Sequence, residues 1–213
     1  MANDVILIES KKMQVLNRSG KLEPVSFDKV LLRISSLSDG PQGLRVDSTK
    51  VSQKVLQGLY DGISTSEIDK YSAEVSASMA MVHPDYNRLA ARITVSNLHR
   101  NTPDTFSGAM QILGLVGPSH LDEFIVNERD FEYDYLGIRT LERSYLLRSS
   151  GVIVERPQYM LMRVAYHLNP DDPVETYEAL SLGLYTHATP TLFNAGTASA
   201  QLASCFLLSN GSD

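Results

Sequence analysis

Apolar residues recur at three- and four-residue intervals through much of this chain, and this spacing constrains its fold more than any other feature. Residues spaced in this way share one face of an α-helix, which can then pack against a core. The first predicted helix begins near Ser26 and ends before the turn residues 39–41. A second helix is predicted from Ser48, with Gly62 at its end.

The start signals of the next two helices are local. Residues 64–67 read STSE, a capping box in which the Ser64 hydroxyl and the Glu67 carboxylate each accept from an amide of the first turn. A fourth helix is predicted from Asp85, just after a proline that restricts the residue before it. Ahead of the helices, residues 13–16 and 22–25 flank a Ser-Gly turn and predict a β-hairpin.

From residue 102 onward the pattern stays mainly helical but becomes less regular. The predicted helices are residues 106–115, 121–127, 139–147, 157–168 and 173–185, and the last two open with proline. Residues 186–192 and 201–208 are predicted to be strands joined by a glycine-containing loop. The predicted fold class is therefore mainly α with a small β component, and it ends with two strands that begin a further β structure.

Composition narrows the class of protein. Of 213 residues, 43% are hydrophobic and 21% charged, which is typical of a globular chain with a substantial core. A net charge of −6 argues against binding nucleic acid through a broad basic surface. No run of eighteen apolar residues occurs, and the start lacks the order of a secretory signal, so we expect a cytoplasmic protein without membrane insertion.

The chain has a single cysteine, Cys205, so an internal disulfide is impossible. The five histidines are scattered rather than paired on one helical face, and we expect no metal site in this chain. A lone cysteine followed by Phe206 and two leucines is most often a small buried hydrophobe. That interpretation stands beside any chemical role for the thiol.

Basic residues gather near the predicted hairpin. Arg18 and Lys21 lie close to its turn, and Lys29 follows in the first turn of the next helix, where free amides also favour phosphate. No phosphate-binding loop motif is present, so an ordinary solvated surface is the alternative. Thr65 and Asp69 share a helical face and could contact a base or ribose, or could be a helix start with a surface acid.

Six segments in order resemble a known family. They read VLNRSGKLEPVSFDKV, HPDYNRLAARITVSNLH, GIRTLERSYLLR, ERPQYMLMRVA, THATPTLFNAG and SCFLL. They resemble the amino-terminal portion of the large catalytic subunit of class I ribonucleotide reductase, in its eukaryotic-type version. The resemblance implies an extension over residues 1–12, a regulatory ATP cone over 13–102, a helical region over 103–185, and the first strands of a ten-stranded α/β barrel over 186–213.

The resemblance also implies a site for ATP or dATP in the cone, with Mg²⁺ accompanying the nucleotide. The implied contacts are Asn17, Arg18, Glu23, Pro24, Val25, Ser26, Phe27, Asp28, Lys29, Thr65, Asp69 and Arg100. The family usually has a lysine before the arginine, so Asn17 removes one positive charge from the phosphate side. Lys21 could compensate for that charge.

Cys205 resembles one of two family cysteines that deliver reducing equivalents to a ribose, and Thr189 and Ser204 resemble substrate-contacting hydroxyls. A thiol at a strand end facing a cavity would be held rigidly beside the sugar. The implied partners are a ribonucleoside diphosphate substrate, a small subunit with a metal-radical cofactor, thioredoxin or glutaredoxin, and further copies of the large subunit. Because the second thiol of the pair is absent from these residues, we expect the chain alone to be inactive.

Two other functions remain open at this level. A stand-alone nucleotide sensor would need the cone but no thiol beside Ser204. A helical adaptor would suit the composition but would explain none of the six segments.

Overall fold

The computed structural model describes residues 13–39, 43–199 and 201–208, which form two compact units divided between Ile93 and Thr94. The division falls inside helix α4 (Asp85–Asn101), which therefore contributes to both units. The predicted extension at residues 1–12, two residues of the predicted turn at 39–41, and the last five residues of the predicted barrel start lie outside the described residues.

The first unit contains the predicted hairpin. Strands β1 (Gln14–Leu16) and β2 (Leu22–Pro24) pair antiparallel, with Val15 opposite Glu23. A third strand, β3 (Ile63–Ser64), pairs in parallel with the other edge of β1. The sequence did not predict β3, because a two-residue strand is too short to show the alternation of a strand.

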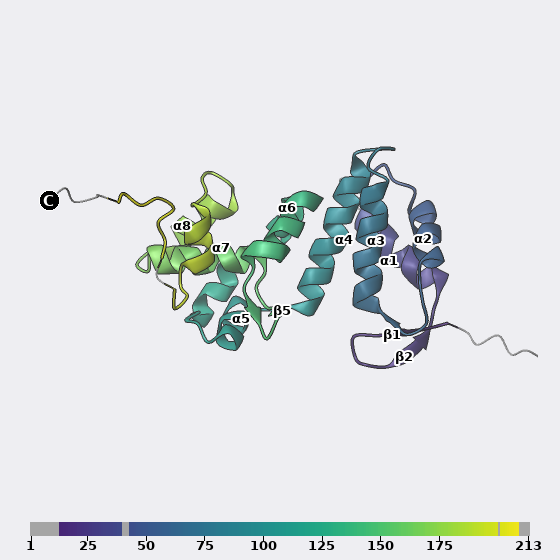
Figure 1. Ribbon diagram of the computed structural model, residues 1–213, viewed down its shortest axis with the longest axis horizontal. Coiled ribbons are helices and arrows are strands. Elements are labelled where there is room, and N and C mark those ends of the chain that lie inside the picture. Colours follow the sequence, from purple (N-terminus) through teal and green to yellow (C-terminus); the bar gives the residue numbers. More distant parts are fainter. Residues whose placement is uncertain (1–12, 40–42, 200, 209–213) are drawn as a thin grey trace, which may run out of the picture. The chain divides into compact units, whose positions relative to one another are not determined.

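The helices of the first unit are α1 (Phe27–Ser38), α2 (Ser48–Gln57), α3 (Thr65–Ser78) and the start of α4. Figure 1 shows α1, α2 and α3 running alongside one another, with the hairpin at one end of this group. Their facing sides bury the apolar residues Val30, Ile34, Val51, Val55, Ile68, Val75, Leu89 and Ile93. The spacing of apolar residues therefore identified the faces that form this core.

Helix α2 begins at the predicted residue but ends earlier than Gly62, which corrects the prediction. Gly58 is its C-cap residue, and the chain then turns back toward β3. A Cβ atom at Gly58 would lie 2.3 Å from the Tyr71 hydroxyl, so close packing against α3 requires glycine here. The sequence pattern did not reveal this tertiary contact.

The predicted capping box at the start of α3 is confirmed. The Ser64 hydroxyl accepts from the amide of Glu67 at 3.1 Å, and the Glu67 carboxylate accepts from the amide of Ser64 at 3.0 Å. Hydrogen bonds from the Ser64 side chain and backbone lower the pKa of Glu67 below its ordinary value of 4.5. This cap fixes the first turn of α3.

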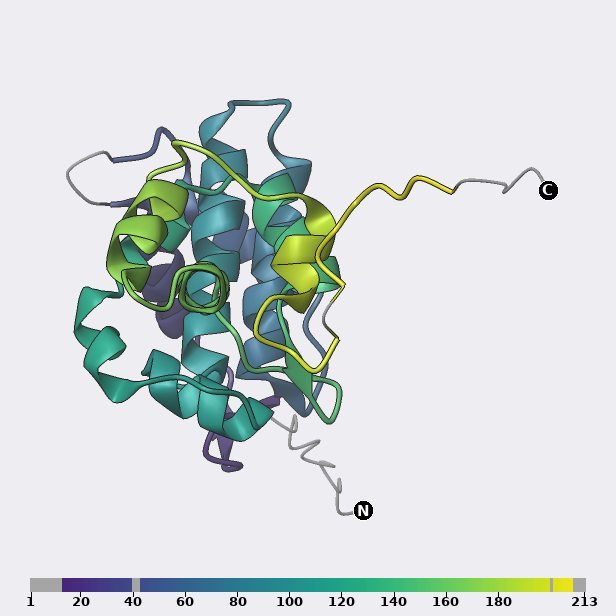
Figure 2. The ribbon, with the colours of Figure 1, turned by 90° about the vertical axis from the view of Figure 1, so that its left-hand side faces the viewer.

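The second unit is organised around α7 (Pro157–Leu168), whose bounds match the prediction. Figure 2 shows α7 along its axis, with other helices of the unit around it. Every residue from Pro157 to Ala165 is buried. Helix α8 (Pro173–Ser181) packs against α7 and ends short of the predicted residue 185, before Gly183 at a positive φ of 69°.

Irregular helices connect the remaining parts of the second unit. Helix α5 (Phe106–Leu113) ends at the left-handed Gly114, close to its prediction. The predicted helix 121–127 is instead two 3₁₀ helices, η1 (Ser119–Phe124) and η2 (Asn127–Glu132). The predicted helix 139–147 is the end of α6 (Tyr135–Thr140) followed by a π-helical turn, η3 (Leu141–Tyr145).

A small hairpin that the sequence did not predict joins η3 to α7. Strands β4 (Arg148–Ser149) and β5 (Val152–Ile153) pair antiparallel. Ser150 and Gly151 between them have φ values of 49° and 82°, and positive φ at both central residues is typical of a tight type I′ turn.

The two strands predicted near the end of the chain are wrong. Residues 189–194 form a helix, α9 (Thr189–Asn194), because Pro190 occupies the start of a helix, where its missing amide costs nothing. Residues 201–208 form no strand, and the described residues contain no part of a ten-stranded barrel. None of the helices in the described ranges is long and apolar enough to cross a membrane.

A buried ion pair holds the end of α9. The Nε atom of Arg163 donates to Glu155 at 2.7 Å, and both side chains are at most 1% exposed. Arg163 also donates to the carbonyl oxygens of Leu192 and Ala195, and Glu155 accepts from the amide of Leu147 at 3.1 Å. One guanidinium thus joins α7, the approach to the β4–β5 hairpin and the last turn of α9.

Candidate functional site

The hairpin loop of the first unit is organised by Asn17. Its side-chain oxygen accepts from the amides of Ser19 at 3.0 Å and Lys21 at 2.9 Å, and the left-handed Gly20 completes the turn. Its side-chain nitrogen donates to Glu23. Asn17 therefore has a structural role in the loop, at the position where the resemblance led us to expect a lysine.

An ion pair joins β2 to the start of α1. The ammonium group of Lys29 donates to Glu23 at 2.6 Å. Hydrogen bonds from Lys29 and then from Asn17 lower the pKa of Glu23 below its ordinary value of 4.5. The Ser26 hydroxyl caps α1 by accepting from the amide of Lys29 at 3.4 Å. The predicted residues from Glu23 to Lys29 thus form one connected corner.

Two arginines meet at a buried carboxylate. Arg33 donates through Nε and Nη2 to the two oxygens of Asp69, both at 3.2 Å, and Nη2 of Arg18 donates to Oδ2 of Asp69 at 3.0 Å. The Asp69 side chain is 7% exposed, whereas the Arg33 and Arg18 side chains are 17% and 30% exposed. We call Arg18, Arg33 and Asp69 the arginine cluster. Two guanidinium groups and one carboxylate leave it with a net positive charge.

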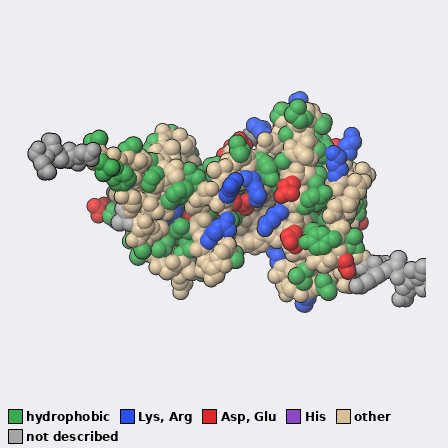
Figure 3. All heavy atoms as spheres, viewed as in Figure 1, with side chains coloured by type: hydrophobic (Ala, Val, Ile, Leu, Met, Phe, Trp, Pro, Cys, Tyr) green, Lys and Arg blue, Asp and Glu red, His purple; other side chains and the backbone are tan. Residues whose placement is uncertain are grey.

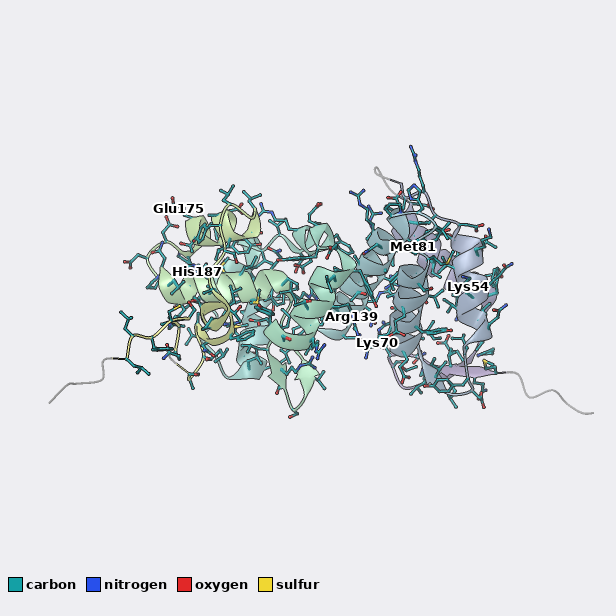
Figure 4. The ribbon with its side chains drawn as sticks, turned by 45° about the horizontal axis from the view of Figure 1, so that its top comes forward. Lys54, Lys70, Met81, Arg139, Glu175 and His187 are labelled. Atoms are coloured by element: carbon teal, nitrogen blue, oxygen red, sulfur yellow. The ribbon has the colours of Figure 1, made fainter. Side chains whose placement is uncertain are left out.

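The cluster brings together two of the predicted residues, Arg18 and Asp69, which are 51 positions apart in sequence. Thr65 lies four residues before Asp69, half-buried in the first turn of α3, and Lys70 beside Asp69 is exposed (Figure 4). The other predicted residues lie along the same corner: Pro24 and Asp28 are exposed, and Val25, Ser26 and Phe27 are half-buried.

Arg100 is not brought to the cluster within the first unit. It is exposed in the last turn of α4, and this part of the helix belongs to the second unit.

Sequence reasoning missed Arg33, although a signal was available. Arg33 follows Lys29 by four residues on α1, so the two basic side chains share a helical face. On the face shown in Figure 3, acidic side chains lie directly beside Lys and Arg side chains. Local clusters, rather than a broad basic surface, are therefore the places where this chain could attract an anion.

The predicted thiol segment is exposed. Cys205 and Ser204 lie in a stretch without regular structure, and the Ser204 hydroxyl is 3.8 Å from the Cys205 sulfur. The predicted strand end that would hold the sulfur is absent from the described residues, and so is the buried environment of a core cysteine. Nearby backbone is tied to α9, since Thr191 donates to the carbonyl of Leu202 at 3.0 Å.

Thr189, the third residue of this predicted group, lines a cavity of about 680 Å³ in the second unit. Its hydroxyl lies 3.0 Å from the Tyr145 hydroxyl. His187, labelled in Figure 4, lines the same cavity, and its buried Nε2 atom has no hydrogen-bond partner among the described residues. Ser204 and Cys205 do not line this cavity.

Comparison with known families places both units. Residues 13–101 match the model of the ATP cone domain, and residues 131–200 match that of the ribonucleotide reductase all-alpha domain. The chain carries both of these domains. The matches confirm the resemblance seen in the sequence, and they place the arginine cluster inside the ATP cone domain, whose presence indicates binding of a nucleotide effector.

Individual relatives agree. The chain is 46% identical to the ribonucleoside-diphosphate reductase large subunit of Arabidopsis thaliana over 92% of its own length. It is 44% identical to large chain 2 of the same enzyme from Saccharomyces cerevisiae over 94% of its length, and 44% identical to the large subunit of vaccinia virus over 92%. The chain spans 27%, 26% and 29% of the length of these three relatives.

Proposed function

We propose that the ATP cone domain binds ATP or dATP at the arginine cluster and that the nucleotide regulates a reductase. The observation that carries this proposal is the meeting of Arg18 and Arg33 at Asp69, because planar guanidinium groups bind phosphate oxygens in pairs. Arg18, the more exposed arginine, contacts the triphosphate, which Mg²⁺ accompanies. Lys29 at the start of α1 adds a second cation, and Thr65 contacts the ribose or base.

For the whole protein we propose reduction of ribonucleoside diphosphates to 2′-deoxyribonucleoside diphosphates. Cys205 and a second cysteine outside these residues supply two electrons and two protons, the 2′-hydroxyl leaves as water, and the two thiols become a disulfide. Thr189 and Ser204 contact the substrate. A small subunit with a metal-radical cofactor starts the reaction, thioredoxin or glutaredoxin reduces the disulfide, and large subunits associate with one another. These roles rest on the similarity to reductase large subunits.

The nucleotide site is tested by calorimetric titration of the chain with ATP and dATP. We expect saturable binding to the unmodified chain and a loss of at least about tenfold in affinity for Arg18→Ala, since a hydrogen bond to a charged group contributes about 1.5–3 kcal/mol. Asp69→Asn is also expected to weaken binding, because it removes the anchor of both arginines.

Arg88→Ala is the matched control, since Arg88 is an exposed arginine of α4 outside the cluster. Its affinity for ATP should match that of the unmodified chain. Absence of binding to the unmodified chain, or equal affinity for Arg18→Ala and Arg88→Ala, would reject the site.

A further inference from the structure

We propose that Arg33 is a positioning residue that keeps Asp69 paired and so allows Arg18 to leave Asp69 for the phosphates of a bound nucleotide. The inference rests on the proposed nucleotide site. It assigns unlike roles to two arginines that contact the same carboxylate.

The two arginines hold Asp69 in different ways. Arg33 spans the carboxylate, with Nε on Oδ1 and Nη2 on Oδ2, so its planar group matches both oxygens. It projects from α1, a helix of twelve residues, and is 17% exposed. Arg18 comes from the hairpin loop, contacts Oδ2 and is 30% exposed. The fold thus fixes Arg33 more firmly than Arg18.

The energetics of Asp69 make this difference matter. A carboxylate that is only 7% exposed is costly to leave without a cationic partner. If Arg33 were absent, moving Arg18 to a phosphate would strand the charge of Asp69 in a buried place. With Arg33 present, Asp69 stays paired while Arg18 changes partner, and the nucleotide gains a guanidinium contact without that cost.

A double-mutant cycle on the 213-residue chain tests the inference, with ATP affinity measured by calorimetry. We expect Arg33→Ala to weaken ATP binding by about tenfold, the size expected when a buried charge loses its partner. In the Asp69→Asn background the same change should alter affinity by less than about twofold, because no carboxylate remains to retain Arg18. Arg33→Lys, which keeps one cationic partner for Asp69, should give an intermediate affinity.

The outcomes separate this inference from the proposed function. If the unmodified chain does not bind ATP, the proposed site fails and the role of Arg33 fails with it. If the unmodified chain binds ATP but Arg33→Ala has no effect, or the same effect in both backgrounds, only the positioning role is overturned. A purely structural or long-range electrostatic role predicts equal effects in both backgrounds. Thermal unfolding of each variant confirms that it is folded, and Arg33→Lys carries the test if Arg33→Ala is not.

Discussion

Replacing Glu155 with alanine is expected to destabilise the second unit by about 3–5 kcal/mol, the largest stability effect we predict for this chain. The change would leave the Arg163 guanidinium, which is 1% exposed, without its carboxylate. The amide of Leu147 would lose its acceptor as well. Because Arg163 also binds two carbonyl oxygens at the end of α9, we expect the loss to extend to that helix.

Hydrogen exchange of the α7 amides measures this effect in the second unit alone. Glu155→Gln should cost less than the alanine variant, because it keeps hydrogen-bonding atoms in place. Glu175→Ala is the matched control, since Glu175 is an exposed residue in the first turn of α8 (Figure 4), where a carboxylate contributes at most about 1 kcal/mol. A Glu155→Ala variant as stable as Glu175→Ala would show that the buried pair contributes little.

Replacing Cys205 with serine in the complete large subunit is expected to abolish multiple turnover. A serine hydroxyl cannot form the disulfide that accepts two electrons from the thiol pair, so the cycle stops without a reductant for the ribose. The measurement is deoxyribonucleotide formed per subunit over time, with thioredoxin or glutaredoxin and the small subunit present. ATP binding should be unchanged, because Cys205 lies outside the ATP cone domain.

Ser199→Ala provides the comparison for this thiol, since Ser199 is an exposed residue shortly before the same segment. We expect it to retain turnover. Full turnover in Cys205→Ser would remove the thiol from the chemistry and leave the exposed Cys205 without a role in the reaction.

Elements whose signals are local were predictable from the sequence. Helix α7 opens with proline and is nearly continuously apolar, and α3 opens with the capping box of Ser64 and Glu67. In both cases residues next to one another in the chain determine where the helix starts. The hairpin of β1 and β2 was predictable for the same reason, because its turn residues lie between its strands.

Elements that depend on distant partners were not predictable. The register of β3 depends on β1, and the end of α2 depends on the ring of Tyr71 against Gly58. Residues 201–208 alternate enough to suggest a strand, but a strand forms only with a neighbour, and none pairs with them among the described residues.

The candidate site shows the same division. Arg18 and Asp69 were predicted through the resemblance, yet their contact required the fold to bring the hairpin loop against α3. Arg33 was missed because nothing local marks a helix arginine as the partner of a carboxylate 36 residues away. The spacing from Lys29 to Arg33 places both on one face of α1 but does not identify their partners.

The most direct test of the account is a crystal structure of this chain with ATP bound. The account predicts phosphate oxygens within hydrogen-bonding distance of the Arg18 guanidinium and the nucleoside near Thr65 at the start of α3. ATP bound elsewhere on the chain, with Arg18 still paired to Asp69 and no phosphate beside it, would contradict the account.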